Sequence, residues 1–72
     1  MNILYNLRYL REHFEKGQKE IAKELNISQQ QYSLYENGKR EIPVHHLVTL
    51  CRYYGVSADY ILGLPKGLSW PQ

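Results

Sequence analysis

Residues Gln18 to Pro43 read QKEIAKELNISQQQYSLYENGKREIP, and this stretch contains two short helical patterns joined by a tight turn. In the first pattern Ile21, Ala22 and Leu25 fall on one face of a helix, and charged residues occupy the opposite face. Asn26 tolerates the left-handed backbone conformation that ends helices, and the second pattern starts directly after it. We therefore predict two consecutive helices, the first ending near Leu25.

The second helical pattern has a clear start and a clear stop. Ser28 suits the N-cap position, and Gln31 three residues later predicts a capping box, in which each side chain bonds the backbone N–H of the other residue. At the other end, Asn37 and Gly38 both tolerate positive φ and stop the helix. The sequence thus predicts a helix over about residues 28–36, entered from a turn of defined geometry.

The flanking sequence predicts three further helices. Pro43 suits the first turn of one helix, Gly55 ends it, and Ser57 caps another before Pro65. The apolar residues that recur at helical spacing are Ile3, Leu7, Leu10 and Phe14 near the N-terminus, and Val44, Leu47, Val48, Cys51 and Tyr54 in the later helix. Because no segment alternates as a strand does, we expect an all-α fold, a compact bundle of about five short helices, with a domain at 1–64 and a tail at 65–72.

Length and composition restrict the kinds of protein that this chain can be. Its 72 residues leave room for one hydrophobic core. Cys51 is the only cysteine, and it has no spacing to His13, His45 or His46 that is typical of a zinc site. The net charge of +2 is too small to indicate nucleic-acid binding by itself. No window approaches the ~18 apolar residues of a membrane span, so we expect a soluble cytoplasmic protein without a metal or cofactor.

Three consecutive glutamines open the predicted helix after Ser28. Helix stability does not require glutamine there, since lysine, glutamate or alanine serve as well or better. A glutamine amide differs from those side chains because it donates and accepts hydrogen bonds together. Adenine presents a donor and an acceptor side by side in the major groove, so a glutamine that pairs with both contributes about 1–3 kcal/mol of discrimination. A glutamine-rich helix start is also common on solvated surfaces, so the surrounding sequence has to decide between the two interpretations.

That surrounding sequence resembles the helix-turn-helix family of phage lambda repressor and Cro, also called the Xre family. The likeness extends from about Leu4 to Gly63 and is most specific from Ser28 to Pro43. In that family the helix beginning at the position of Ser28 lies in the major groove, and the preceding helix crosses the DNA backbone. The resemblance therefore implies a DNA-binding domain whose recognition helix covers about residues 28–36.

The resemblance assigns the reading of bases to the outer side of that helix. Gln29 and Gln30 match the family's principal base-reading positions, and Ser33 faces the same general side. Leu34 departs from the family, in which this position is usually polar or basic; a leucine there contacts a thymine methyl group or marks weaker recognition. Gln31 is either a DNA contact or is occupied by the capping box.

The resemblance also implies contacts to phosphates and one structural ion pair. Gln18 matches a glutamine whose side chain and backbone address a phosphate at a helix start, and a short basic loop follows the recognition helix. The implied phosphate-binding residues are Gln18, Ser28, Gln31, Asn37, Lys39 and Arg40. Arg11 and Glu36 match a pair that joins the first helix to the recognition helix, so we expect them to support the scaffold and not to read DNA.

These observations favour a transcriptional regulator, on economy a repressor, that binds double-stranded DNA at a palindromic operator as a homodimer. Two recognition helices would then lie about 34–36 Å apart on successive major grooves. The sequence predicts a dimer interface where apolar groups continue past the last core helix, at Tyr60, Leu64, Leu68 and Trp70.

Two other classes of function compete with this hypothesis. An antitoxin-like or accessory protein-interaction module, in which DNA binding is secondary, is supported by Leu34 and by the tyrosine-rich composition. An enzyme is disfavoured because the sequence has no nucleophile with a base at usable spacing, no phosphate-cradling glycine loop and no carboxylate pair in a predicted cleft. We therefore expect no small-molecule substrate.

Overall fold

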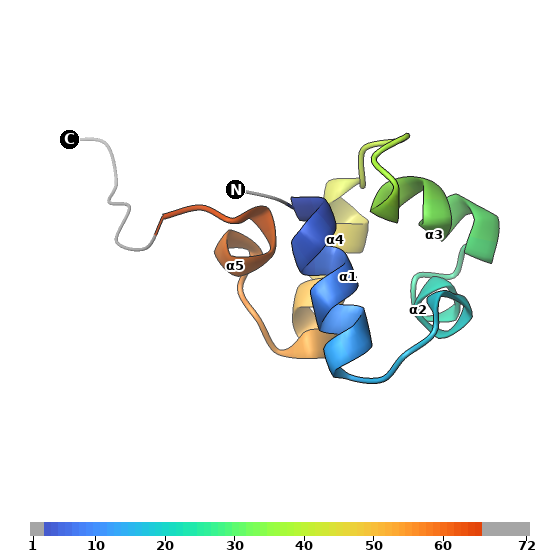
Figure 1. Cartoon of the computed structure of the whole chain (residues 1–72), viewed down its shortest axis with the longest axis horizontal. Coiled ribbons are helices and arrows are strands. Elements are labelled where there is room, and N and C mark those ends of the chain that lie inside the picture. The colour runs from blue at the N-terminus through green and yellow to red at the C-terminus, as the bar shows by residue number, and fades with distance from the viewer. Residues whose placement is uncertain (1–2, 66–72) are drawn as a thin grey trace.

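The computed structural model describes residues 3–65, which form five helices and no strand. The helices are α1 (Ile3–His13), α2 (Gln18–Glu24), α3 (Gln29–Glu36), α4 (Val44–Tyr54) and α5 (Ala58–Leu62). Figure 1 shows α2 and α3 on one side of α1 and α5 on the other, with α4 behind α1. The predicted all-α fold with a short helix, a tight turn and a second helix is confirmed.

The helix ends follow local sequence signals. Ser28 is the N-cap of α3, where its Oγ accepts the backbone N–H of Gln31 at 3.1 Å, and Ser57 is the N-cap of α5. Asn26 has a φ of 60° in the turn between α2 and α3, and Gly55 has a φ of 72° after α4. Both positions lie in the left-handed region that ends helices, so these residues determine where the chain changes direction.

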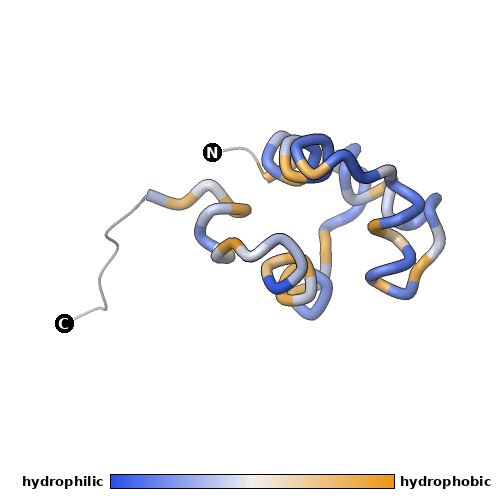
Figure 2. The backbone as a smooth tube through the Cα atoms, turned by 90° about the horizontal axis from the view of Figure 1, so that it is seen from below, coloured by the Kyte–Doolittle hydropathy of each residue, from blue (hydrophilic) through white to orange (hydrophobic). Residues whose placement is uncertain are grey.

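All five helices contribute to one hydrophobic core. Every helix carries both hydrophilic and hydrophobic positions (Figure 2), as expected for amphipathic helices that share a core. The side chains buried most completely are Tyr32, Leu7, Ile21, Leu50 and Ile61. Three of these five lie in α1, α2 and α3, so the same packing that stabilises the domain also holds the two-helix unit in place.

The side of α4 that faces the core differs from the prediction. Val44 is 73% exposed and Val48 is 42% exposed, although both were expected among the core positions. Leu50, which was not, is completely buried beside Leu47 and Tyr54. Apolar residues cover a wide part of the surface of this helix, and only some of them pack against the other helices. Helical spacing alone does not show which of these apolar residues are buried.

The end of α1 also differs from the prediction. The helix ends at His13, and Glu15 takes a φ of 57°, so Phe14 no longer continues the buried face of α1. Its side chain is 44% exposed, and its ring packs 5.4 Å from that of Tyr54 on α4. Phe14 therefore covers the edge of the core and does not lie inside it.

A side chain on α1 bonds the backbone of α5, in addition to the core packing of Ile61. The Asn6 amide Nδ2 donates to the backbone carbonyls of Tyr60 and Ile61, each at 3.1 Å. Carbonyl groups in the last turn of a helix have no partner within the helix, so a donor from a neighbouring helix satisfies them. This contact joins two segments that are far apart in the sequence and fixes the side of the domain opposite α3.

Candidate nucleic-acid interface

The start of α3 presents two amide side chains to solvent. Gln29 and Gln30 are the first residues of the helix, and both are exposed. Further along the helix, Tyr32 is 0% exposed and Tyr35 is 4% exposed. A helix with buried aromatic side chains on one side and exposed amides at its N-terminal end can project those amides without any change in the domain.

Gln31 is held within α3 and does not complete the expected capping box. Its backbone N–H bonds Ser28, which is the first half of that arrangement. Its side-chain Nε2, however, donates to the hydroxyl oxygen of Tyr35 at 3.0 Å. The second half of the predicted capping box is therefore wrong, because an acceptor one turn further along the helix competes with the backbone of Ser28.

Ser33 and Leu34 lie in the middle of α3, and both are partly buried. The Oγ of Ser33 accepts a hydrogen bond from Nδ2 of Asn37 at 3.1 Å, which ties the last turn of the helix to the loop that follows. The structure thus places all four predicted base-reading residues on one helix. The two glutamines lie at its exposed end, and Ser33 and Leu34 are partly covered by the rest of the domain.

The basic loop after α3 is anchored through its backbone. Gly38 has a φ of +74°, and a Cβ at this position would lie 2.8 Å from Cδ1 of Leu4. Both features favour glycine. The backbone N–H groups of Lys39 and Arg40 donate to the carbonyl of Leu34 at 3.0 and 3.3 Å. The side chains of Lys39 and Arg40 are exposed, so two cations are presented from an ordered turn.

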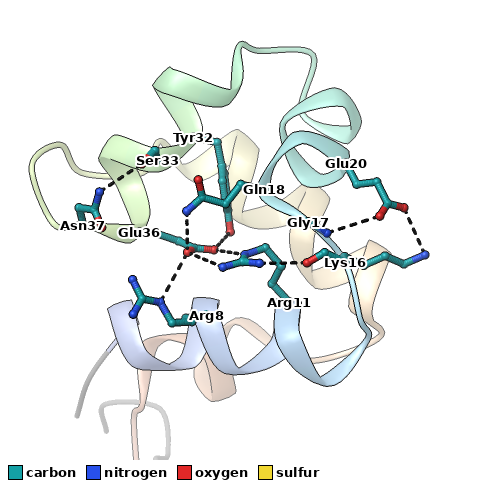
Figure 3. A network of polar contacts seen from close by, with 10 residues as sticks. All are labelled: Arg8, Arg11, Lys16, Gly17, Gln18, Glu20, Tyr32, Ser33, Glu36 and Asn37. Carbon is teal, nitrogen blue, oxygen red and sulfur yellow. Dashed lines mark hydrogen bonds and ion pairs between the residues drawn. The ribbon is translucent and has the colours of Figure 1, made fainter.

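A buried carboxylate connects α1, α2 and α3 (Figure 3). Arg11 donates from Nε to Oε2 of Glu36 at 2.6 Å and from Nη2 to Oε1 at 3.1 Å. The hydroxyl of Tyr32 donates to Oε2 at 2.8 Å, and Nε2 of Gln18 donates to Oε1 at 3.1 Å. The side chains of Glu36 and Arg11 are 0% and 13% exposed. Arg11 and Glu36 therefore form a buried, hydrogen-bonded ion pair that holds α3 against α1.

Gln18 has an internal partner that the sequence did not indicate. Its bond to Glu36 ties the start of α2 to the end of α3, whereas the resemblance implied only a contact to DNA. An amide nitrogen carries two hydrogens, so this bond leaves a second donor on the same group. Gln18 is partly exposed, which is compatible with an internal bond and an external contact together.

The pKa of Glu36 lies below its usual value of 4.5. Burial is the largest single influence and would raise this pKa, but the hydrogen bonds from Arg11, Tyr32 and Gln18 together outweigh it. The folded protein therefore binds fewer protons at this site than the unfolded chain does. The stability contributed by Glu36 is present above the unfolded pKa and is lost as the pH falls through the folded pKa.

We expect the stability difference between the natural protein and a Glu36→Gln variant to be constant near neutral pH and to shrink below about pH 5, as the pH falls past the unfolded pKa and through the lower folded pKa of Glu36. The natural protein should have the higher urea midpoint near neutral pH, because only a carboxylate neutralises the buried Arg11. Both proteins share all other carboxyl groups, so the difference between their midpoints reports Glu36. Helical circular dichroism at each pH measures it, and a difference independent of pH would contradict the proposed role of the ionised carboxylate.

His46 supports α3 from α4. Its side chain is buried, with its ring 6.0 Å from that of Tyr35 and 4.2 Å from that of His45. Burial, followed by the neighbouring His45, lowers the pKa of His46. A neutral imidazole is thus favoured beneath α3.

Arg8 lies beside the buried network and was not identified from the sequence. Its Nε is 3.8 Å from Oε1 of Glu36, and its side chain is 54% exposed. Arg8 precedes Arg11 by three residues, so both side chains leave the same face of α1. That spacing is the signal that could have identified it.

The two described residues of the predicted dimer interface lie away from α3. Tyr60 and Leu64 are 44% and 41% exposed, at the side of the domain formed by α5. Leu68 and Trp70 lie outside the described residues. The structure therefore offers two exposed apolar side chains of the predicted set, at a distance from the glutamines of α3.

Residues 3–65 contain no group of three His, Cys, Asp or Glu side chains able to hold a metal ion. Cys51 is partly buried, and burial raises the pKa of its thiol. None of the described helices combines the length and the hydropathy needed to cross a membrane.

Comparison with known proteins identifies the arrangement of α2 and α3. Residues 7–61 match the family described as helix-turn-helix, a span that includes both helices and the whole Glu36 network. The chain belongs to the lambda repressor-like helix-turn-helix family. The predicted family is confirmed, and the members of this family are DNA-binding transcriptional regulators.

Two regulators from Bacillus subtilis (strain 168) are similar to this helix-turn-helix domain. The uncharacterised HTH-type transcriptional regulator YobD is 40% identical over 58 residues, which cover 81% of this chain and 52% of YobD. The HTH-type transcriptional regulator ImmR is 36% identical over 63 residues, which cover 88% of this chain and 50% of ImmR. The chain thus spans about half the length of each of these curated relatives.

Proposed function

We propose that this domain is a sequence-specific transcriptional repressor that places α3 in the major groove of a palindromic operator. The observation that carries the proposal is the exposed pair Gln29 and Gln30 at the N-terminal end of a helix whose opposite side is fixed in the core. The major groove of B-DNA is wide enough to admit an α-helix. Membership of the helix-turn-helix family supports the same conclusion.

Gln29 and Gln30 are the proposed readers of base edges. Each amide can donate and accept at once, which matches the adenine edge in the major groove. Ser33 and Leu34 follow on the same helix and would contribute a hydroxyl bond and an apolar contact with a thymine methyl group. Since Ser33 and Leu34 are partly buried whereas the glutamines are exposed, the glutamines should carry most of the specificity.

Contacts to the DNA backbone would position this helix. Lys39 and Arg40 supply exposed positive charge from the anchored loop, which suits the neutralisation of phosphates. Amide and hydroxyl groups supply further hydrogen bonds. The proposed phosphate contacts are Gln18, Ser28, Gln31, Asn37, Lys39 and Arg40.

The repressor would bind as a homodimer. Tyr60 and Leu64 are exposed beside α5, and we propose that they form the interface together with Leu68 and Trp70. In such a dimer the two copies of α3 would lie about 34–36 Å apart and read two half-sites in successive major grooves. A dimer of this small domain would repress transcription in the cytoplasm by covering the promoter.

Selection of bound duplexes from a random pool tests this function. We expect enrichment of one sequence with two inverted half-sites whose centres are about 10–11 base pairs apart. The same experiment reports binding, specificity and half-site spacing together. A pool that shows no enrichment after repeated rounds would refute sequence-specific binding, and a single half-site would refute the dimer.

Removing the two loop cations should weaken the salt dependence of DNA binding. For the double variant Lys39→Ala, Arg40→Ala we expect the slope of log affinity against log salt concentration to fall in magnitude by about two, close to 0.9 for each lost phosphate contact. The loss should be similar for all DNA sequences, because phosphates carry no base information. Lys39→Arg, which keeps the charge, is the matched control and should retain the slope. An unchanged slope in the double variant would exclude these residues from the interface.

A second candidate function, a protein-interaction module, is favoured by exposed aromatic side chains on α1. The rings of Tyr5 and Tyr9 are 6.1 Å apart and those of Tyr9 and His13 are 5.7 Å apart, both stacked. Tyr5 is 63% exposed and Tyr9 is 44% exposed, and exposed apolar surface is typical of protein contacts. An antitoxin-like module whose DNA binding is secondary would give little enrichment in the selection experiment, which separates the two functions.

A further inference from the structure

Glu36 is satisfied without any contribution from Arg8. Its two carboxylate oxygens already accept four hydrogen bonds, two of them from Arg11, whose charge neutralises the carboxylate. Arg8 approaches only to 3.8 Å, which is beyond hydrogen-bond distance. Two guanidinium groups therefore lie beside one carboxylate. Arg11 neutralises Glu36, so the charge of Arg8 gives the junction of α1, α2 and α3 a net positive charge.

This extra charge is close to the surface. The side chain of Arg8 is 54% exposed, against 13% for Arg11. Within residues 3–65 the Nη groups of Arg8 have no hydrogen-bond partner, since only its Nε approaches Glu36. Attraction to Glu36 at this distance restricts where the side chain lies, and the two Nη groups stay available as donors.

The charge is also placed next to a proposed phosphate contact. Nε of Arg8 and Nε2 of Gln18 approach the same oxygen, Oε1 of Glu36, from α1 and from the start of α2 (Figure 3). Glu36 is followed directly by Asn37 and the basic loop. Arg8 therefore lies at the junction of the two segments to which the proposed function assigns backbone contacts.

The geometry points to Arg8 as a further phosphate-binding residue, which contacts the DNA backbone beside the phosphate of Gln18. A guanidinium presents its Nη donors in a planar fork that matches phosphate oxygens. The ion pair with Glu36 engages Nε, so the two Nη groups are the donors left to contact a phosphate. This assignment rests on the proposed function and adds a DNA contact from α1, the helix that also carries the structural Arg11.

The salt dependence of operator binding tests the assignment. Duplexes obtained by selection are titrated with the natural protein and with Arg8→Ala, Arg8→Lys and Arg52→Ala at several salt concentrations. For Arg8→Ala we expect weaker binding and a slope of log affinity against log salt that is smaller in magnitude by about one. The ratio of the natural protein's affinity to that of Arg8→Ala should therefore fall about threefold between 50 and 200 mM salt. Arg8→Lys should restore the slope because it restores the charge. Arg52 is exposed in the last turn of α4, and its substitution should leave the slope unchanged.

The possible outcomes separate this inference from the proposed function. Urea midpoints of the four proteins show whether a substitution unfolds part of the sample. Partial unfolding would lower the apparent affinity, but the slope of log affinity against log salt would stay the same for the molecules that are folded. If the natural protein binds duplexes and Arg8→Ala has the same slope, the assignment of Arg8 is wrong and the proposed function stands. If the natural protein binds no duplex at any salt concentration, the proposed function itself fails.

Discussion

Arg11→Ala should destabilise the domain by about 3–5 kcal/mol, because it leaves a buried carboxylate without its charge partner. The side chain of Glu36 is 0% exposed, and after the substitution only Tyr32 and Gln18 would still donate to it. A domain of this size rarely has a core worth more than about 3–5 kcal/mol. We therefore expect the variant to be largely unfolded at room temperature, and urea denaturation at neutral pH followed by helical circular dichroism measures the change.

Arg8→Ala is the matched control for this experiment. It removes the same chemical group from the same face of α1, but its side chain is 54% exposed and its nitrogen is 3.8 Å from the carboxylate. Exposed ion pairs contribute about 0–1 kcal/mol, so its urea midpoint should stay close to that of the natural protein. Equal midpoints for Arg11→Ala and Arg8→Ala would show that burial does not govern the strength of these ion pairs.

The double variant Gln29→Ala, Gln30→Ala should lose about 2–6 kcal/mol of binding energy at the selected operator, which is at least a 30-fold loss of affinity. Each glutamine amide that pairs with a base edge contributes about 1–3 kcal/mol, and alanine retains none of these bonds. Fluorescence anisotropy with an operator duplex and with a scrambled duplex measures the effect. The affinity for the scrambled duplex should change little, because binding without sequence preference depends on phosphate contacts.

Folding should not explain this loss. Both glutamines are exposed, and alanine is the best helix former, so the urea midpoint of the double variant should equal or exceed that of the natural protein. A variant that still prefers the operator as strongly as the natural protein does would show that α3 reads the DNA through other residues.

Local sequence signals predicted most of the fold. Ser28, Ser57, Asn26 and Gly55 act where the sequence indicated, because capping and positive φ depend on a few neighbouring residues. The position of Gln29 as the first residue of α3 was predicted in the same way, from Ser28 as the N-cap. These features could be predicted since their physical causes lie within one turn of the chain.

Features that depend on competition between alternative partners or alternative packing faces could not be predicted. Val44 is exposed because other apolar residues of α4 pack against the core, which spacing does not reveal. Gln31 bonds Tyr35 and Gln18 bonds Glu36, and in both cases a nearby acceptor within the fold competes with the partner that the sequence indicated. The spacing of Arg8 and Arg11 indicates a shared face of α1, but only the fold shows that Glu36 is buried beside that face.

The anchoring of α3 separates two sets of positions that can be varied independently. Tyr32, Tyr35 and Glu36 attach the helix to the domain, whereas Gln29 and Gln30 take no part in that attachment. Under the proposed function, new operator preferences would be engineered by exchange of the outer residues of this short helix, with the inner ones retained. A library of DNA specificities would then vary only a few exposed positions of the domain.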